Sequence, residues 1–298
     1  MTLTDLVAEW INARSLNLAA STISGYRRLW RLYIAPARAG AVELSALDGS
    51  DMLDLLRPLI DRGCTRQAQL LQVLVSAALR SAVKRRLIQY NVMDEVDKVR
   101  HKCQVTPWLT VDQARQLLSS SKEAHDRYYI AWLLMLCCGL RRGEMLALRW
   151  SDIDEARAVL HVQRQQVVVD RRSLISRPKS LSSVRDIPLD DHLLTVLLLQ
   201  PRAGDDILKG VTRTMLAHGL DRALSRAGLP RVTLHGLRHT MASVAVDGAI
   251  DIRVLQSLMG HAHYQTTADI YAHVNQQPRV EAAKIIANSL IGARLEIV

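Results

Sequence analysis

The segment Leu234–Ser243 reads LHGLRHTMAS and places two histidines and an arginine close together. On a helix His235 and Arg238 are three residues apart and share a face, whereas His239 is expected to point away from that pair. Both lie in the first turn, where a helix favours a bound anion. These residue types predict a catalytic cluster that binds a phosphate; the alternative is a basic turn on a surface helix.

Further residues of suitable chemistry occur at the ends of other predicted elements: Arg141, Lys179, His261 and Tyr271. Arg141 begins a helix after Gly139, and His261 follows Gly260 at the end of another. Tyr271 lies on the helix after that. Lys179 is the only lysine between positions 123 and 208, so its loop has one proton donor among arginines, which do not give up a proton.

The elements that must position these residues are mostly helical. Residues 1–98 contain amphipathic helices, which predict a small bundle. A polar, basic stretch at 99–108 is interpreted as a linker. Residues 109–298 contain helices on both sides of a Val- and Ile-rich region, between about 159 and 188, that is typical of strands. The predicted fold class is mainly α with a small antiparallel β-sheet: a helical bundle followed by an α+β domain.

Charge and composition restrict the partners. The 298-residue chain has a net charge of +10, which favours a polyanion such as double-stranded DNA. Only seven of its 39 basic residues are lysine, and the arginine fork suits phosphate. The sequence shows no signal-peptide pattern and no apolar run long enough to span a bilayer, and the four cysteines are expected to be reduced thiols in the cytosol. Candidate DNA contacts are Arg27, Arg28, Arg31, Lys98, Arg100 and Lys102.

Five segments occur in an order and spacing that resemble the tyrosine recombinase, or phage integrase, family. They are GLRRGEMLALRWSDID, RPKSLSSVRDIPL, HGLRHTMAS, LMGHA and TTADIYAHV. The resemblance implies a core-type DNA-binding domain at 1–98, a catalytic domain with a C-terminal tail at 109–298, and no arm-binding domain. It also implies an active-site set of Arg141, Lys179, His235, Arg238, His261 and Tyr271.

That resemblance implies site-specific recombination of duplex DNA through a covalent 3′-phosphotyrosyl intermediate. Tyr271 would be the nucleophile, His235 its base and Lys179 the acid for the leaving 5′-oxygen, with the other three residues stabilising the phosphate. No metal, other cofactor or ATP is required. The alternatives are a DNA-binding regulator with an inactive site, a type IB topoisomerase, and a zinc enzyme using His235 and His239, although that pair lacks the acid of an H-E-x-x-H motif.

The expected assembly is a homotetramer on two DNA sites, because each protomer cuts one strand and recombination needs four cuts. A directionality factor is a further candidate partner, and the expected location is the bacterial cytosol, with the nucleoid when DNA is bound. The C-terminal tail places Val280, Ala283, Ile286 and Leu290 on one face of a predicted helix. This apolar face would pack either on its own domain or on a neighbouring protomer.

Overall fold

The computed structural model describes residues 1–101, 106–170, 172–178, 183–202 and 204–260. The chain divides into two compact units. The first consists of Met1–Gln104 with Val168–Ser173, and the second of Val105–Val167 with Leu174–Val298. Lys102, Lys179, His261, Tyr271 and the C-terminal tail lie outside the described residues.

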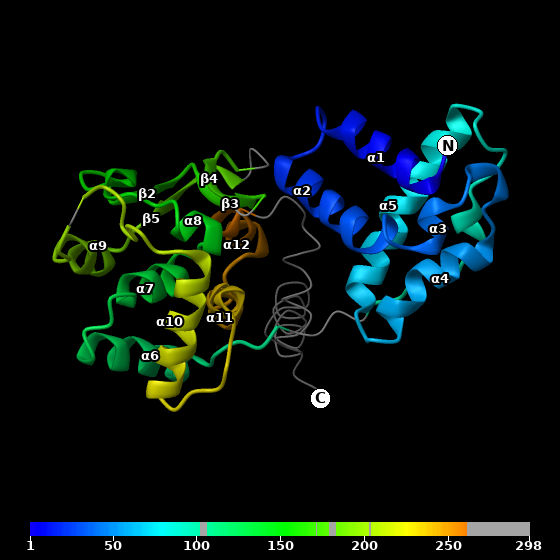
Figure 1. Cartoon of the computed structure of the whole chain (residues 1–298). Helices are drawn as coiled ribbons and strands as arrows, with labels where there is room; N and C mark the ends of the chain where they lie inside the picture. Colours follow the sequence, from blue (N-terminus) through cyan, green and yellow to red (C-terminus); the bar gives the residue numbers. More distant parts are fainter. Residues whose placement is uncertain (102–105, 171, 179–182, 203, 261–298) are drawn as a thin grey trace, which may run out of the picture. The chain divides into compact units, whose positions relative to one another are not determined.

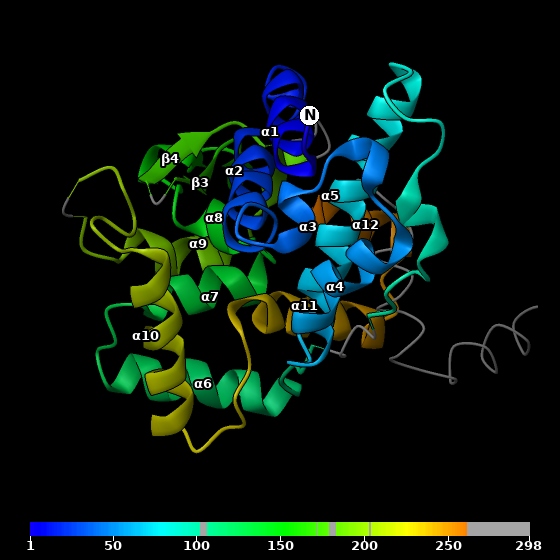
Figure 2. The ribbon, with the colours of Figure 1, turned by 45° about the vertical axis from the view of Figure 1, so that its right-hand side comes forward.

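The part of the first unit up to residue 101 is helical and is blue to cyan in Figure 1. In chain order it contains α1 (Leu3–Arg14), α2 (Ala20–Leu29), a π-helical turn (Trp30–Ile34), α3 (Arg38–Ala41), a 3-10 turn (Leu44–Ala46), α4 (Gly49–Ile60), α5 (Thr65–Lys84) and a second 3-10 turn (Val92–Glu95). The Thr2 hydroxyl accepts a hydrogen bond from the Asp5 amide and caps α1, which buries its apolar face against α5. Figure 2 shows α4 beside α5, and these two helices are in contact.

The second unit combines helices with two small sheets. From residue 111 on, the chain forms α6 (Val111–Glu123), α7 (Tyr129–Cys137), α8 (Arg142–Met145), a 3-10 turn (Trp150–Asp152), β1 (Ile153–Asp154), β2 (Val159–Val162), β3 (Gln165–Val169), β4 (Arg172–Ser176), β5 (Arg185–Pro188), α9 (Asp191–Leu198), α10 (Arg213–Arg226), α11 (Leu234–Asp247) and α12 (Ile252–Met259). The end of β3 and the start of β4 belong to the segment Val168–Ser173 of the first unit. The strand order β1-β2-β5 is antiparallel, with Leu160 opposite Ile187, and β3 pairs with β4. The predicted fold class is confirmed, although the strands form two sheets where one was expected.

Helix α7 is the centre of the second unit's core. Every residue from Ile130 to Leu136 is buried, as the apolar run predicts. Both α6 and α11 contact α7, and α10 contacts α6 (Figure 1). The Thr240 hydroxyl accepts a hydrogen bond from the Leu109 amide at 3.0 Å, which ties α11 to the chain entering α6. The helices that carry the candidate site are therefore held against a rigid apolar core. Within the described residues, no helix is long and apolar enough to cross a membrane.

Candidate active site

Arg238 lies in the first turns of α11 and is almost completely buried. The Thr233 hydroxyl caps this helix by accepting a hydrogen bond from the Gly236 amide at 3.1 Å. The two terminal nitrogens of Arg238 donate to the carbonyl oxygens of Gly139 and Met259, each at 2.5 Å. Its Nε is buried and has no hydrogen-bond partner among the described residues. Burial, and then the charge of Arg141, lower the pKa of Arg238 to about 9, so the side chain stays cationic at pH 7.

Arg141 reaches the same place from another element. It precedes α8 and follows Gly139, whose φ of +59° lets the chain turn sharply between α7 and α8. The Arg141 Nη1 donates to Glu144 Oε1 at 2.7 Å, and Nη2 donates to the Gly260 carbonyl. Its side chain is 32% exposed, so unlike Arg238 it has a solvent-accessible part. The predicted position of Arg141 at a helix start is confirmed.

Three arginines converge on the last carbonyls of α12. Consecutive carbonyls at a helix end lack intrahelical donors and carry partial negative charge. Here Gly260 ends α12 in the left-handed conformation, with a φ of +62°. The Arg185 Nε donates to the Leu258 carbonyl at 2.6 Å, next to the carbonyls that Arg238 and Arg141 bind. The end of α12, which immediately precedes His261 in the sequence, is therefore fixed by side chains from the α8 start, β5 and α11.

Among the described residues, Glu144 is the only carboxylate in contact with this group of arginines, and it contacts Arg141 and Arg185. It is 1% exposed and accepts both Arg185 Nη1 at 3.1 Å and Arg185 Nη2 at 2.9 Å. Burial alone would raise the pKa of Glu144, but the hydrogen bonds and charges of Arg185, and then of Arg141, lower it below its ordinary value. Three cations and one anion leave surplus positive charge, which suits an anionic ligand.

Arg185 was missed by the sequence reasoning. Its position in VRDIPL resembles a solvated strand end, but the strand alternates buried and exposed residues, and Arg185 takes a buried position. Arg185 is two residues before the apolar Ile187 and therefore lies on the same face of the strand, which was the sequence signal that Arg185 is buried. Such a residue is almost never buried unless it is paired.

His235 and His239 form an edge-to-face pair. Their ring centroids are 4.6 Å apart, so the expectation that His239 points away was wrong: residues four apart also share a helix face. Partial burial of the ring, and then the charges of His239 and the nearby arginines, lower the pKa of His235 to about 4. The residue as a whole is exposed to solvent. Burial and Arg238 also lower the pKa of His239. At pH 7 His235 is therefore neutral and able to accept a proton.

Of the six predicted catalytic residues, the structure brings together Arg141, His235 and Arg238. Five of the candidate DNA contacts are exposed in the first unit: Arg27, Arg28, Arg31, Lys98 and Arg100. None of these five forms an ion pair with a carboxylate in the described part of the chain, so their charges are available to a ligand. No group of three or more His, Cys, Asp or Glu side chains that could hold a metal occurs in the same ranges.

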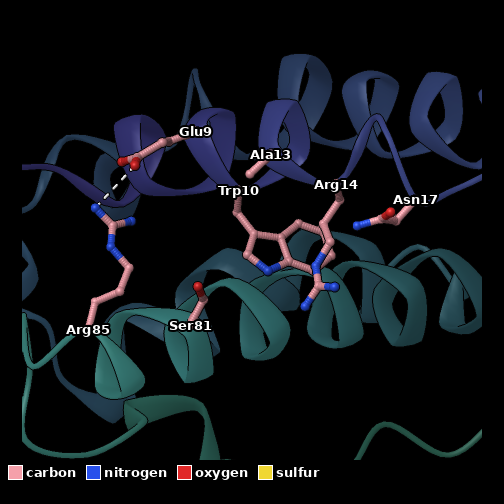
Figure 3. A pocket seen from close by; sticks show the side chains of 7 residues that line it. All are labelled: Glu9, Trp10, Ala13, Arg14, Asn17, Ser81 and Arg85. Atoms are coloured by element: carbon pink, nitrogen blue, oxygen red, sulfur yellow. Dashed lines mark ion pairs between the residues drawn. The ribbon is translucent and has the colours of Figure 1, made fainter.

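A separate pocket of about 410 Å³ lies between α1 and α5 in the first unit (Figure 3). The indole of Trp10 extends from α1 toward α5, and the Arg14 guanidinium lies 5.6 Å from its ring centroid. Glu9 Oε1 forms an ion pair with Arg85 Nη2 at 3.1 Å beside it. The pocket contains no candidate catalytic residue and no candidate DNA contact.

Comparison with known proteins identifies a family over much of the chain. The model of the phage integrase family matches residues 107–278, more than half of the sequence. A tyrosine recombinase XerC-like protein from Caldanaerobacter subterraneus is 28% identical over 211 residues, which are 60% of this chain and 54% of the relative. The ICEBs1 integrase of Bacillus subtilis is 18% identical over 260 residues, covering 81% of this chain and 71% of the integrase. The match thus spans only about half the length of the first of these relatives.

Solved structures resemble the fold over nearly the whole chain. The Tn1549 transposon integrase, in complex with a circular intermediate DNA, has a TM-score of 0.80 at 23% identity and covers 95% of this chain and 99% of its own. A lambda integrase tetramer bound to a Holliday junction has a TM-score of 0.70 at 19% identity, covering 91% of this chain and 77% of that one. At these identities the likeness concerns the fold. Together with the family match, it shows that the chain belongs to the phage integrase family of tyrosine recombinases.

Proposed function

We propose that the protein is a site-specific recombinase that cuts and rejoins duplex DNA through a covalent 3′-phosphotyrosyl link to Tyr271. The observation that carries the proposal is the buried, cationic Arg238, whose Nε has no partner in the described part of the chain. A buried unsatisfied donor needs an explanation. An anion such as the scissile phosphate, bound beside Arg141 and Arg238, would supply the missing acceptor and use the surplus positive charge.

The proposed reaction follows from these groups. The Tyr271 oxygen attacks the phosphorus, the bond to the 5′-oxygen breaks, and the added negative charge falls on the non-bridging oxygens that Arg141 and Arg238 would bind. The neutral His235 accepts the tyrosine proton, Lys179 protonates the leaving 5′-oxygen, and His261 donates to the phosphate. Attack of a 5′-hydroxyl on the phosphotyrosine reverses these steps, so rejoining needs neither ATP nor a metal.

The exposed arginines of the first unit and the net charge of +10 support duplex DNA as the substrate. Double-stranded DNA would be held by a core-type domain, residues 1–98, and a catalytic domain, residues 109–298, joined by the linker 99–108. We also propose a homotetramer on two DNA sites, by analogy with the lambda integrase tetramer on a Holliday junction. A directionality factor is a candidate partner, and the DNA substrate implies action at the chromosome in the bacterial cytosol.

The test is recovery of a covalent DNA adduct on Tyr271. The full-length protein is expressed in bacterial cells, where it can react with genomic DNA. Covalent complexes are isolated under denaturing conditions, and the attached DNA is sequenced. The recovered sequence is then placed in a nicked duplex that traps the cleaved state. Wild type is expected to form the adduct in excess EDTA without ATP, and Tyr271→Phe to bind the duplex but form none.

Two of the alternatives, the inactive regulator and the zinc enzyme, give different results in this assay. A regulator with an inactive site would bind the duplex without any adduct, which would overturn the proposal. Activity that is lost in EDTA and restored by zinc would support the metalloenzyme. An adduct that persists in Tyr271→Phe would assign the nucleophile to another residue.

A further inference from the structure

Arg185 is a buried arginine whose three nitrogens all donate to the protein. Its Nε donates to the Leu258 carbonyl, its Nη1 to Glu144 Oε1 and to the Ser183 carbonyl at 3.2 Å, and its Nη2 to Glu144 Oε2. Every nitrogen of the guanidinium group therefore has a protein acceptor, in contrast to the Nε of Arg238. Four of the five N–H groups of Arg185 are thus bound to the protein, and no direct contact with the phosphate is assigned to it.

The carboxylate of Glu144 is shared between two arginines. Its Oε1 accepts from Arg141 Nη1 at 2.7 Å and from Arg185 Nη1 at 3.1 Å. Its Oε2 accepts from the Arg141 amide at 2.8 Å and from Arg185 Nη2 at 2.9 Å. Without Arg185, the full charge of this buried carboxylate would fall on Arg141 and offset the positive charge that a phosphate needs.

Arg185 also aligns the end of α12. Its bond to the Leu258 carbonyl is adjacent to the bonds from Arg238 to Met259 and from Arg141 to Gly260. Strand β5, which begins at Arg185, packs against α12. One side chain thus connects the carboxylate that orients Arg141 with the helix end that both phosphate-binding arginines contact.

We propose that Arg185 is a positioning residue for phosphoryl transfer: it takes a share of the Glu144 charge and fixes the end of α12, so that Arg141 keeps its positive charge for the scissile phosphate. The inference rests on the proposed function and adds a residue that does not touch the substrate. The inference requires that loss of Arg185 slow the chemical step, and that the step be slowed most on a substrate whose phosphate gains negative charge in the transition state.

The experiment compares two versions of the nicked duplex that carries the sequence recovered from the Tyr271 adduct. One has a normal scissile phosphodiester, and the other a methylphosphonate, in which a neutral methyl group replaces one charged oxygen. Arg185→Met in the full-length chain is expected to lower the single-turnover rate constant on the phosphodiester, measured at saturating DNA, by about 10- to 100-fold. This decrease is smaller than the decrease expected when a direct anion donor is removed. On the methylphosphonate the defect is expected to shrink about tenfold, because less charge must be stabilised. The adduct endpoint and the DNA dissociation constant should stay within about twofold of wild type.

Arg164→Met is the matched control. Arg164 Nη2 pairs with Asp152 Oδ1 at 2.9 Å, and Asp152 is 1% exposed, so this change also removes an arginine from a buried carboxylate. Within the described ranges, the hydrogen-bonded partner of the Arg164 guanidinium is Asp152, and Arg164 contacts neither Glu144 nor Arg141. Any defect in this variant is expected to be equal on both substrates. If Arg185→Met does not fold, Arg185→Lys keeps the cation and is expected to show a smaller defect with the same methylphosphonate dependence.

Two results would overturn the inference. Equal defects of the Arg185 variants on both substrates, or a lower adduct endpoint at an unchanged rate constant, would make Arg185 a purely structural residue. Failure of wild type to form any adduct would instead contradict the proposed function, so the two failures are distinguishable.

Discussion

Replacement of Arg238 by methionine is expected to remove most of the catalytic activity while changing the stability of the second unit little. Burial, and then the charge of Arg141, lower the pKa of Arg238 from 12.5 to about 9, which at 1.36 kcal/mol per pKa unit corresponds to a cost of about 5 kcal/mol for holding the charge at this place in the fold. Its bonds to the Gly139 and Met259 carbonyls, at about 1.5–3 kcal/mol each for a charged donor, offset this by about 3–6 kcal/mol. The net change in unfolding free energy is therefore within about 2 kcal/mol of zero. Loss of an anion donor should lower kcat by about 10²–10³-fold.

Hydrogen exchange of peptides from α7 and α11 would measure this stability without interference from the first unit. Leu237→Ala is the control at the neighbouring position, because Leu237 is 0% exposed and its truncation should cost about 2–5 kcal/mol. The cleavage rate of Arg238→Met is measured on the same nicked duplex. If Arg238→Met destabilised the unit as much as Leu237→Ala, the reasoning about the burial of this charge would be wrong.

Three further predictions concern the candidate catalytic residues and the tail. Because the fold lowers the pKa of His235 to about 4, the neutral ring persists at pH 7 and is protonated only as the pH falls toward 4. The pH profile of kcat/KM should therefore show no loss of activity with an apparent pKa near 6.5, and such a loss would contradict the assignment of His235 as the base. Lys179→Ala should slow cleavage about 10²–10⁴-fold, and sulfur at the bridging 5′-position should restore most of the rate in this variant but not in Arg141→Ala; equal behaviour would rule out Lys179 as the acid. Deletion of residues 279–298 should preserve binding to one DNA site and abolish the tetramer on two sites in native gel shifts; paired complexes formed by the truncated chain would show that the tail packs on its own domain.

Much of the fold could be predicted from the sequence because helix formation depends on neighbours a few residues apart. The apolar run after Tyr129 predicts the buried α7, and the spacing of His235 and Arg238 predicts that they share a face in the first turn of a helix, which is α11. Gly139 before Arg141 predicts a turn and a new helix. These are local rules of capping and periodicity, and they locate each candidate residue on its own element.

Only the tertiary structure decided how these residues meet. Arg141, Arg185 and Arg238 bind consecutive carbonyls at the end of α12, because the α8 start, β5 and α11 all pack around that helix end. The local sequence around Arg185 does not specify Glu144 as its partner, since strand pairing and helix packing bring together residues more than forty positions apart. The positive charge available to a phosphate depends on these long-range contacts. A linear motif does not show that the buried carboxylate of Glu144 accepts hydrogen bonds from both Arg141 and Arg185.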